Sequence, residues 1–151
     1  MQYHMKNFNC EKVSETLLKG RVTELLCIQK FLTLGYIVST PEVPCQYDIL
    51  LDTGKNIFKI QIKTCHLNKE GTGIEFNTSS TTHNSNGYIK RIYTPSMVDY
   101  FCTYYDNECY LVPFSECGST IKCLRLVPTK NGQVKNISFA ENYLAEEILN
   151  K

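Results

Sequence analysis

Two short stretches of this 151-residue chain decide its fold: Tyr47–Asp52 (YDILLD) and Ile57–Cys65 (IFKIQIKTC). In both, apolar and polar residues alternate in short runs that are rich in β-branched and aromatic side chains, a pattern typical of β-strands. The turn between them, residues 52–56, contains Gly54 and is too short for a crossover connection. The two stretches are therefore predicted to form an antiparallel hairpin.

Alternation in the second strand divides its side chains between two faces. The apolar face consists of Phe58, Ile60 and Ile62, and the polar face consists of Lys59, Gln61 and Lys63. We expect the apolar face to pack into the core beneath the first helix. Because Asp48 precedes Gln61 by thirteen residues, a bent hairpin brings the Asp48 carboxylate near the Gln61 amide and the Lys63 ammonium.

These three side chains favour metal-assisted phosphate chemistry. Hard oxygen ligands suit Mg²⁺, which activates water, and a nearby amine stabilises negative charge that develops on a phosphate. Asp52, at the end of the first strand, is expected to form the turn and not to bind a metal.

A helix is predicted over the first 35 residues, because apolar side chains recur there at about 100° per residue. Its expected core-facing stripe is Leu17, Leu18, Arg21, Val22, Leu25, Ile28 and Leu32. Gly35 supplies the stop, and Pro41 and Pro44 mark a loop before the hairpin.

Further strands are predicted at residues 73–77, 98–105, 109–112 and 121–127. Residues 78–87 contain no apolar side chain, which predicts a solvated loop. Ser138 and Glu141 have the spacing of a capping box that opens a last helix through Leu149. This order predicts an α/β (α+β) fold, in which a mixed central sheet is flanked by helices in a single domain, residues 1–151.

Composition excludes several classes of protein. The 16 Lys and Arg residues nearly balance the 15 Asp and Glu residues, which excludes histone-like, acidic-tail and disordered chains. No membrane span and no signal peptide are expected, so the predicted location is cytoplasmic. The eight cysteines contain no C-x-x-C pair and are expected to be free thiols.

Positive charge is concentrated around the hairpin and the polar segment that follows it, which favours a nucleic-acid partner. The Ser, His and Asn side chains of residues 78–87 can hydrogen-bond phosphates and base edges. The candidate DNA contacts are Lys55, Lys59, Lys69, Ser79, Ser80, His83, Asn84, Lys90 and Arg91.

The hairpin resembles the core of PD-(D/E)XK nucleases, with Asp48 as the first carboxylate and Lys63 as the lysine; Gln61 stands where that pattern has an acid. One branch with Gln-x-Lys at this place is the group I intron-associated homing endonucleases. Further matching segments are Gly20-x-x-x-Glu24, Leu34-Gly35-Tyr36, Ile60-Gln61-Ile62-Lys63-Thr64, Tyr93, Val98-Asp99-Tyr100-Phe101, Tyr110-Leu111-Val112-Pro113 and Phe139-Ala140-Glu141-x-Tyr143.

This resemblance implies a restriction-endonuclease-like core and a sequence-specific DNA endonuclease that depends on Mg²⁺, with Mn²⁺ as a substitute. It implies that Asp48, Glu24, Gln61 and the backbone carbonyl of Ile62 hold the metal, and that Lys63 positions the attacking water. Glu24 lies at the border of the helix stripe, where a bound cation or Lys63 would relieve the cost of an unpaired charge.

The implied partner is double-stranded DNA, bound by a homodimer or homotetramer. The apolar residues near the C-terminus could bury in the oligomer interface or close the monomer core; they are Phe139, Tyr143, Leu144 and Ile148.

Three other functions remain open. A restriction or junction-resolving nuclease would share the same core. The second alternative is a non-catalytic DNA-binding or regulatory protein whose nuclease site has lost its metal, which would explain why Gln61 replaces the expected acid. A cysteine-based metal or redox protein is the third alternative.

Overall fold

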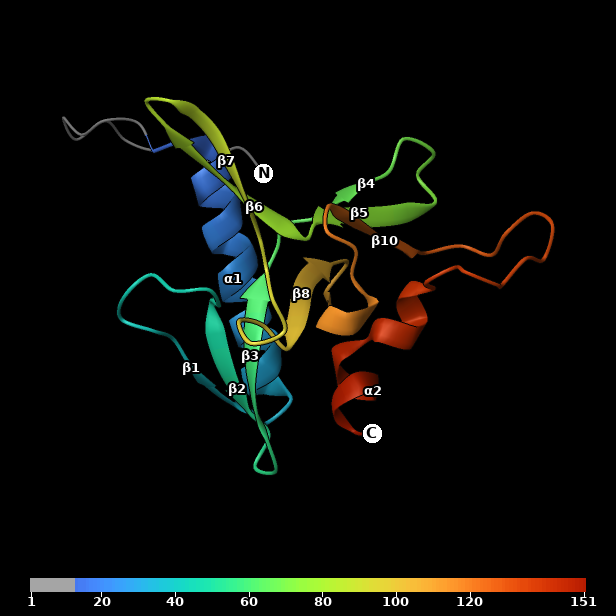
Figure 1. The fold of residues 1–151 in the computed structure, drawn as a ribbon. Helices are drawn as coiled ribbons and strands as arrows, with labels where there is room; N and C mark the ends of the chain where they lie inside the picture. The colour runs from blue at the N-terminus through green and yellow to red at the C-terminus, as the bar shows by residue number, and fades with distance from the viewer. Residues whose placement is uncertain (1–12) are drawn as a thin grey trace.

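The computed structural model describes residues 13–151, without the side chains of residues 82–84. Its largest layer is a five-stranded mixed sheet of order β1-β2-β3-β8-β9 (Figure 1). The strands are β1 (Ile37–Ser39), β2 (Ile49–Asp52), β3 (Ile57–Ile62), β8 (Tyr100–Tyr105) and β9 (Glu108–Pro113). Strands β3 and β8 are parallel, and the other neighbours are antiparallel. The predicted mixed α+β architecture is confirmed.

The antiparallel pairing of β2 with β3 confirms the predicted hairpin. Its turn contains Gly54 at φ +78°, and the Gly54 N–H donates to Asp52 Oδ1 at 2.7 Å, so Asp52 caps the turn as expected. Both strands are shorter than predicted. The register pairs Ile49 with Ile60, which places Asp48 directly opposite Gln61, one residue beyond the ladder.

The first helix, α1 (Glu15–Thr33), is confirmed, with Ser14 as its N-cap and Gly35 at φ +87° beyond its end. Residues 1–12 of the predicted helix lie outside the described part of the chain. The predicted core-facing stripe is wrong for most of its residues: Ile28 packs against the core, but the buried helix residues are Thr23, Cys27 and Phe31. The leucines of the predicted stripe include Leu17, Leu25 and Leu32, which are 50–68% exposed. The face of α1 that contacts the sheet is the one that becomes buried. The pattern of apolar residues along the helix does not show which face makes that contact.

The central sheet is covered on both faces. On one face, α1 packs over a core that includes Ile49, Leu51, Ile60 and Ile62. On the other, a three-stranded sheet of order β10-β5-β4 contributes Ile74, Phe76 and Leu124 to a second core with Phe101, Tyr110 and Val112. The bounds are β4 (His66–Leu67), β5 (Gly73–Asn77) and β10 (Ile121–Arg125). The polar face of β3 is therefore partly enclosed, and Gln61 is only 9% exposed.

The predicted loop at residues 78–87 is wrong in conformation. Thr81 and residues 85–87 are exposed as expected, whereas Thr78 is buried. The segment forms most of a two-stranded hairpin, β6 (Ser79–Asn84) and β7 (Gly87–Ile92), which projects from the rest of the protein (Figure 1). The turn at its tip is Ser85-Asn86, and Gly87, which follows it and begins β7, has φ +116°. Because threonine favours strands and backbone pairing needs no core, a polar sequence can form this ribbon.

The predicted capping box at Ser138 is also wrong. A 3-10 turn at residues 140–143 precedes the five-residue α2 (Ala145–Leu149), and neither has a side-chain cap. The Ser138 hydroxyl instead accepts a hydrogen bond from Lys122 Nζ at 2.8 Å. Tyr143, Leu144 and Ile148 pack against the two cores of this chain. These residues therefore close the monomer core.

Within residues 13–151, no helix is long and apolar enough to cross a membrane. The cysteines in this range are free thiols, namely Cys27, Cys45, Cys65, Cys102, Cys109, Cys117 and Cys123.

Candidate active site

The candidate site begins where β2 and β3 meet. The Asp48 N–H donates to the Ile60 carbonyl at 2.9 Å, which fixes the backbone of Asp48 beside β3. Its carboxylate oxygen Oδ2 accepts two hydrogen bonds of 2.7 Å, from Gln61 Nε2 and from the Ile62 N–H. The expected meeting of Asp48 and Gln61 is thus confirmed, and strand register is its cause.

The environment of Asp48 disfavours its charged form. Burial raises the pKa of this carboxyl to about 6, and the Glu24 carboxylate adds to the rise, whereas the Ile62 N–H, Lys63 and Arg21 oppose it. A partly buried carboxylate whose negative charge is incompletely balanced is a suitable ligand for a cation.

Lys63 lies on the same side of β3 as Gln61 and is held by several contacts. Its ammonium donates to the Tyr93 hydroxyl at 3.0 Å and to the Ser79 carbonyl at 3.4 Å, and it lies 4.9 Å from the centroid of the Tyr93 ring. Its backbone N–H donates to the Cys102 carbonyl of β8 at 2.8 Å. The lysine is therefore positioned by β8 and by the start of β6.

Tyr93 received no role in the site from sequence alone. It lies 30 residues from Lys63, and its ring packs edge-on against Phe101, with centroids 5.3 Å apart. The matching segments included Tyr93, but no spacing rule links it to Lys63, because the β6–β7 hairpin lies between them.

Glu24 projects from α1 toward this group. Its Oε2 accepts a hydrogen bond from Arg21 Nη1 at 2.7 Å, and its charge acts on Asp48. The sequence suggested a cation or Lys63 as the partner of Glu24, and the structure gives it Arg21 as a partner. This pair is partly exposed, so it contributes little stability and leaves the carboxylate able to turn toward a ligand.

The donor set suits a hard divalent cation. Asp48 and Glu24 offer carboxylate oxygens, and Gln61 donates through Nε2, which leaves Oε1 as its possible ligand atom. The Ile62 carbonyl accepts from Gln61 Nε2 at 3.3 Å and retains a second lone pair. All four donors are oxygen atoms, the preferred ligands of Mg²⁺.

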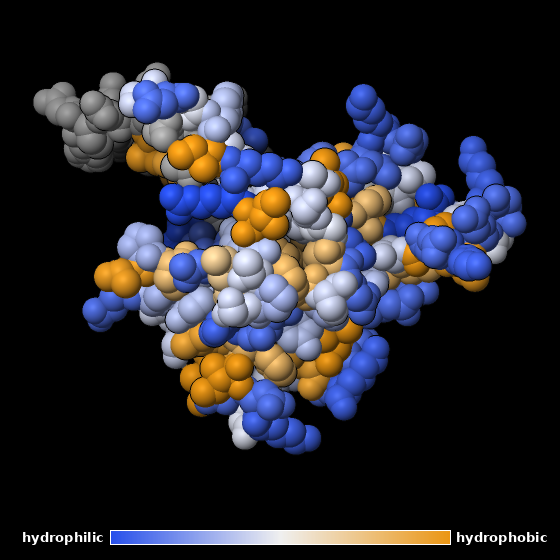
Figure 2. All heavy atoms as spheres, viewed as in Figure 1, coloured by the Kyte–Doolittle hydropathy of each residue, from blue (hydrophilic) through white to orange (hydrophobic). Residues whose placement is uncertain are grey.

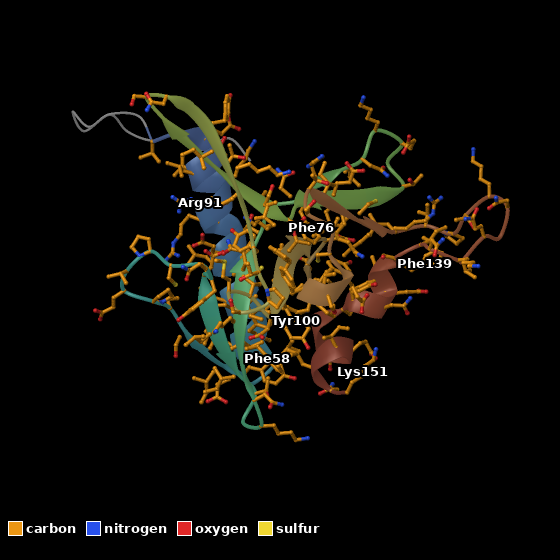
Figure 3. The ribbon with its side chains drawn as sticks, viewed as in Figure 1. Phe58, Phe76, Arg91, Tyr100, Phe139 and Lys151 are labelled. Carbon is orange, nitrogen blue, oxygen red and sulfur yellow. The ribbon has the colours of Figure 1, made fainter. Side chains whose placement is uncertain are left out.

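The candidate DNA contacts are dispersed. Ser79, Ser80, Lys90 and Arg91 lie on the β6–β7 hairpin, where Ser80 pairs with Arg91. Figure 2 shows strongly hydrophilic residues over α1 and the base of this hairpin, where Figure 3 labels Arg91. The side chains of His83 and Asn84 lie outside the described part of the structure.

Three other candidate lysines lie elsewhere. Lys59 Nζ donates to the Ser96 carbonyl at 2.9 Å. Lys55 occupies the β2–β3 turn, at the opposite end of β3 from Lys63, and Lys69 occupies the turn between β4 and β5. The structure therefore does not bring Lys55 to the Asp48 group.

Two comparisons identify relatives of this chain. The family model for PD-(D/E)XK endonucleases matches residues 14–146. The structure of a bacterial homing endonuclease, I-Ssp6803I, superposes with a TM-score of 0.70 at 21% sequence identity and covers 91% of this chain and 93% of that one. No curated protein sequence matches. The structural likeness shows a shared fold, and because the family model spans most of the chain, this protein belongs to the PD-(D/E)XK endonuclease family.

Proposed function

We propose that this protein is a metal-dependent endonuclease that hydrolyses phosphodiester bonds at a specific site in double-stranded DNA, as a homing endonuclease does. The observation that carries the proposal is the Asp48 carboxylate, held by Gln61 and Ile62 at 2.7 Å beside the anchored Lys63. Family membership and the fold shared with a bacterial homing endonuclease support the same reaction.

Asp48, Glu24, Gln61 Oε1 and the Ile62 carbonyl would hold Mg²⁺, or Mn²⁺ in its place. Such an ion lowers the pKa of bound water and neutralises charge on the scissile phosphate. The protein keeps Asp48 in place for this task through two hydrogen bonds, and a cation would offset the electrostatic cost of its burial.

Lys63 would position the attacking water and stabilise the charge that develops on the phosphate. Tyr93 holds the Lys63 ammonium by a hydrogen bond and a cation–π contact. The Lys63 side chain would therefore lose little conformational freedom when DNA binds. The products would carry 5′-phosphate and 3′-hydroxyl ends.

The β6–β7 hairpin would contact the DNA. A two-stranded ribbon fits the major groove, and this one presents hydroxyl groups on β6 beside Lys90 and Arg91 on β7. A protein of this size reads a long target as an assembly of copies, so a homodimer or homotetramer on a pseudo-palindromic site is part of the proposal.

Cleavage of a supercoiled plasmid library with Mg²⁺ tests the proposal. The parent protein should make discrete cuts that disappear with EDTA and with Asp48→Ala. Asp52→Ala is the matched control, because Asp52 ends the same strand but caps the turn through Gly54. Equal cutting by the parent and Asp48→Ala would contradict the site. A four-way junction assayed in parallel distinguishes a junction-resolving enzyme from a site-specific one.

A non-catalytic DNA-binding protein is the second candidate function, and Gln61 favours it because an amide is a weaker metal ligand than a carboxylate. Calorimetry with Mn²⁺ separates the two. Heat of binding that depends on Asp48 supports the nuclease, and DNA binding without any Asp48-dependent uptake of metal supports the alternative.

A further inference from the structure

Three cysteines from three separate elements meet in the core between α1 and the central sheet. Cys27 lies on α1, Cys102 on β8 and Cys109 on β9, and all three are fully buried. The Sγ atoms of Cys27 and Cys102 are 3.7 Å apart, and the three Sγ atoms all lie within 4.8 Å of one another. Among the side chains that the structure describes, which exclude those of residues 82–84, no other group of three or more His, Cys, Asp or Glu converges in this way.

These separations fit one shared ion. Sulfur ligands bind Zn²⁺ at about 2.3 Å, which places neighbouring sulfurs about 3.8–4.0 Å apart in tetrahedral or trigonal coordination. The three sulfur atoms would therefore need to move by less than about one ångström to coordinate a shared cation.

The electrostatics of the cluster also suit a cation. Contacts with the Cys102 and Cys27 thiols lower the pKa of the Cys109 thiol, and the nearby Lys30 ammonium lowers it further. Burial raises the pKa of the Cys102 thiol. A metal that binds here would displace the protons that remain on the three thiols.

Lys30 places a positive charge at the edge of this cluster. Its Nζ forms an ion pair of 2.9 Å with Glu108 and donates to the Asn107 carbonyl at 3.2 Å, in the β8–β9 turn. Three thiolates and one divalent ion have a net charge of −1, which Lys30 would offset.

We propose that Cys27, Cys102 and Cys109 form a structural site for one thiophilic d¹⁰ cation, Zn²⁺ or Cu⁺. Thiolates select these ions over Mg²⁺, so the site is chemically distinct from the oxygen donors around Asp48. It lies on the α1 side of the sheet, whereas Gln61 lies on the opposite face of β3.

The ion would stabilise the framework of the candidate active site. It would link α1, which carries Glu24, to β8, whose Cys102 carbonyl accepts the Lys63 N–H. Because a fully buried site is formed as the chain folds, loading is expected to be most efficient during refolding.

The test uses full-length protein that has been stripped of metal and kept reduced. It is titrated with Cd²⁺, both folded and during refolding, and the ultraviolet thiolate-to-Cd²⁺ band is followed. We expect one equivalent to bind and the melting temperature to rise. Cys109→Ala should weaken binding at least about tenfold, and Cys45→Ala and Cys123→Ala, at exposed thiols, should not.

Competition with Zn²⁺ and Cu⁺ chelators then identifies the preferred ion. Cys27 and Cys102 are buried even without metal, so their alkylation in the parent protein is compared with and without Cd²⁺ in partly denaturing buffer, by mass spectrometry. Slower alkylation with Cd²⁺ supports the site even if Cys109→Ala folds poorly. If neither the folded nor the refolding protein takes up a stoichiometric amount of metal, the proposal is wrong. It is also wrong if uptake survives Cys109→Ala and is lost in Cys45→Ala or Cys123→Ala.

Discussion

Asp48 shows how one residue serves the proposed chemistry at a cost to stability. Its Oδ2 replaces a backbone acceptor for the Ile62 N–H and also receives the Gln61 amide. Both bonds favour the charged form, yet burial and the Glu24 carboxylate outweigh them and raise its pKa to about 6. The native state therefore binds a proton at Asp48 more tightly than the unfolded chain does.

The Asp48→Asn variant should be more stable than the parent in EDTA at pH 7.5. A raised carboxyl pKa means that this residue destabilises the fold above about pH 6, and that the destabilisation disappears as pH falls toward about 4. A shift of two pKa units corresponds to at most about 3 kcal/mol. Chemical denaturation from pH 4 to 8 measures it: the difference between variant and parent should grow with pH.

Asp52→Asn is the matched control for this stability experiment, and it should show no gain. Added Mn²⁺ should stabilise the parent and leave Asp48→Asn unchanged. A variant less stable than the parent at pH 7.5 would contradict this account of Asp48.

At the scale of elements, the β6–β7 hairpin and the β5–β10 pair illustrate opposite dependences on packing. The residues of β7 are exposed throughout, so that strand is shaped by pairing with β6 and by the Ser85-Asn86 turn. Strand β5, by contrast, is clamped between β4 and β10 and supplies Ile74 and Phe76 to the second core. Substitutions should therefore affect binding in the first element and stability in the second.

The double variant Lys90→Ser/Arg91→Ser should bind DNA more weakly and with a smaller dependence on salt. Each lost phosphate contact lowers the slope of log K against log [salt] by about one unit. Binding measured at several salt concentrations tests this. Lys130→Ser/Lys135→Ser, in the loop on the other side of the molecule (Figure 1), is the charge-matched control and should have a smaller effect. Equal losses in the two double variants would remove the hairpin from the interface.

The Gly73→Ala variant should lose about 1–3 kcal/mol of unfolding free energy. A Cβ at this position in β5 would lie 2.7 Å from the Leu124 carbonyl oxygen of β10, and that backbone cannot move without disturbing the pair. Gly20→Ala in α1 is the contrasting control, because its Cβ meets nothing within 4 Å and alanine favours a helix. Denaturant titration should show the two changes with opposite signs.

For the whole molecule, most large apolar side chains lie in the two cores, and others are exposed on α1 and on strands such as β7. Of the C-terminal residues considered for an interface, Tyr143, Leu144 and Ile148 pack against the cores, and Figure 3 shows Phe139 and Lys151 on that C-terminal segment. Leu25 and Leu32 remain about half exposed on α1. An assembly of copies would need apolar surface of this kind.

Sedimentation at tens of micromolar should therefore reveal species heavier than the 17.4 kDa monomer. Leu25→Glu/Leu32→Glu should shift them toward the monomer with an unchanged circular dichroism spectrum, because neither side chain belongs to the cores. A parent protein that sediments strictly as a monomer would refute the proposed assembly, and an unaffected double variant would exclude this face of α1.

Local sequence determined the β2–β3 hairpin, the extent of α1 within residues 13–151 and the meeting of Asp48 with Gln61, since turn length and strand alternation act over few residues. Only the tertiary structure decided which face of α1 is buried, that Tyr93 holds Lys63 and that three distant cysteines converge. These features arise when elements far apart in the chain pack together. Their geometry depends on the fit between whole surfaces, which no local pattern of residues encodes.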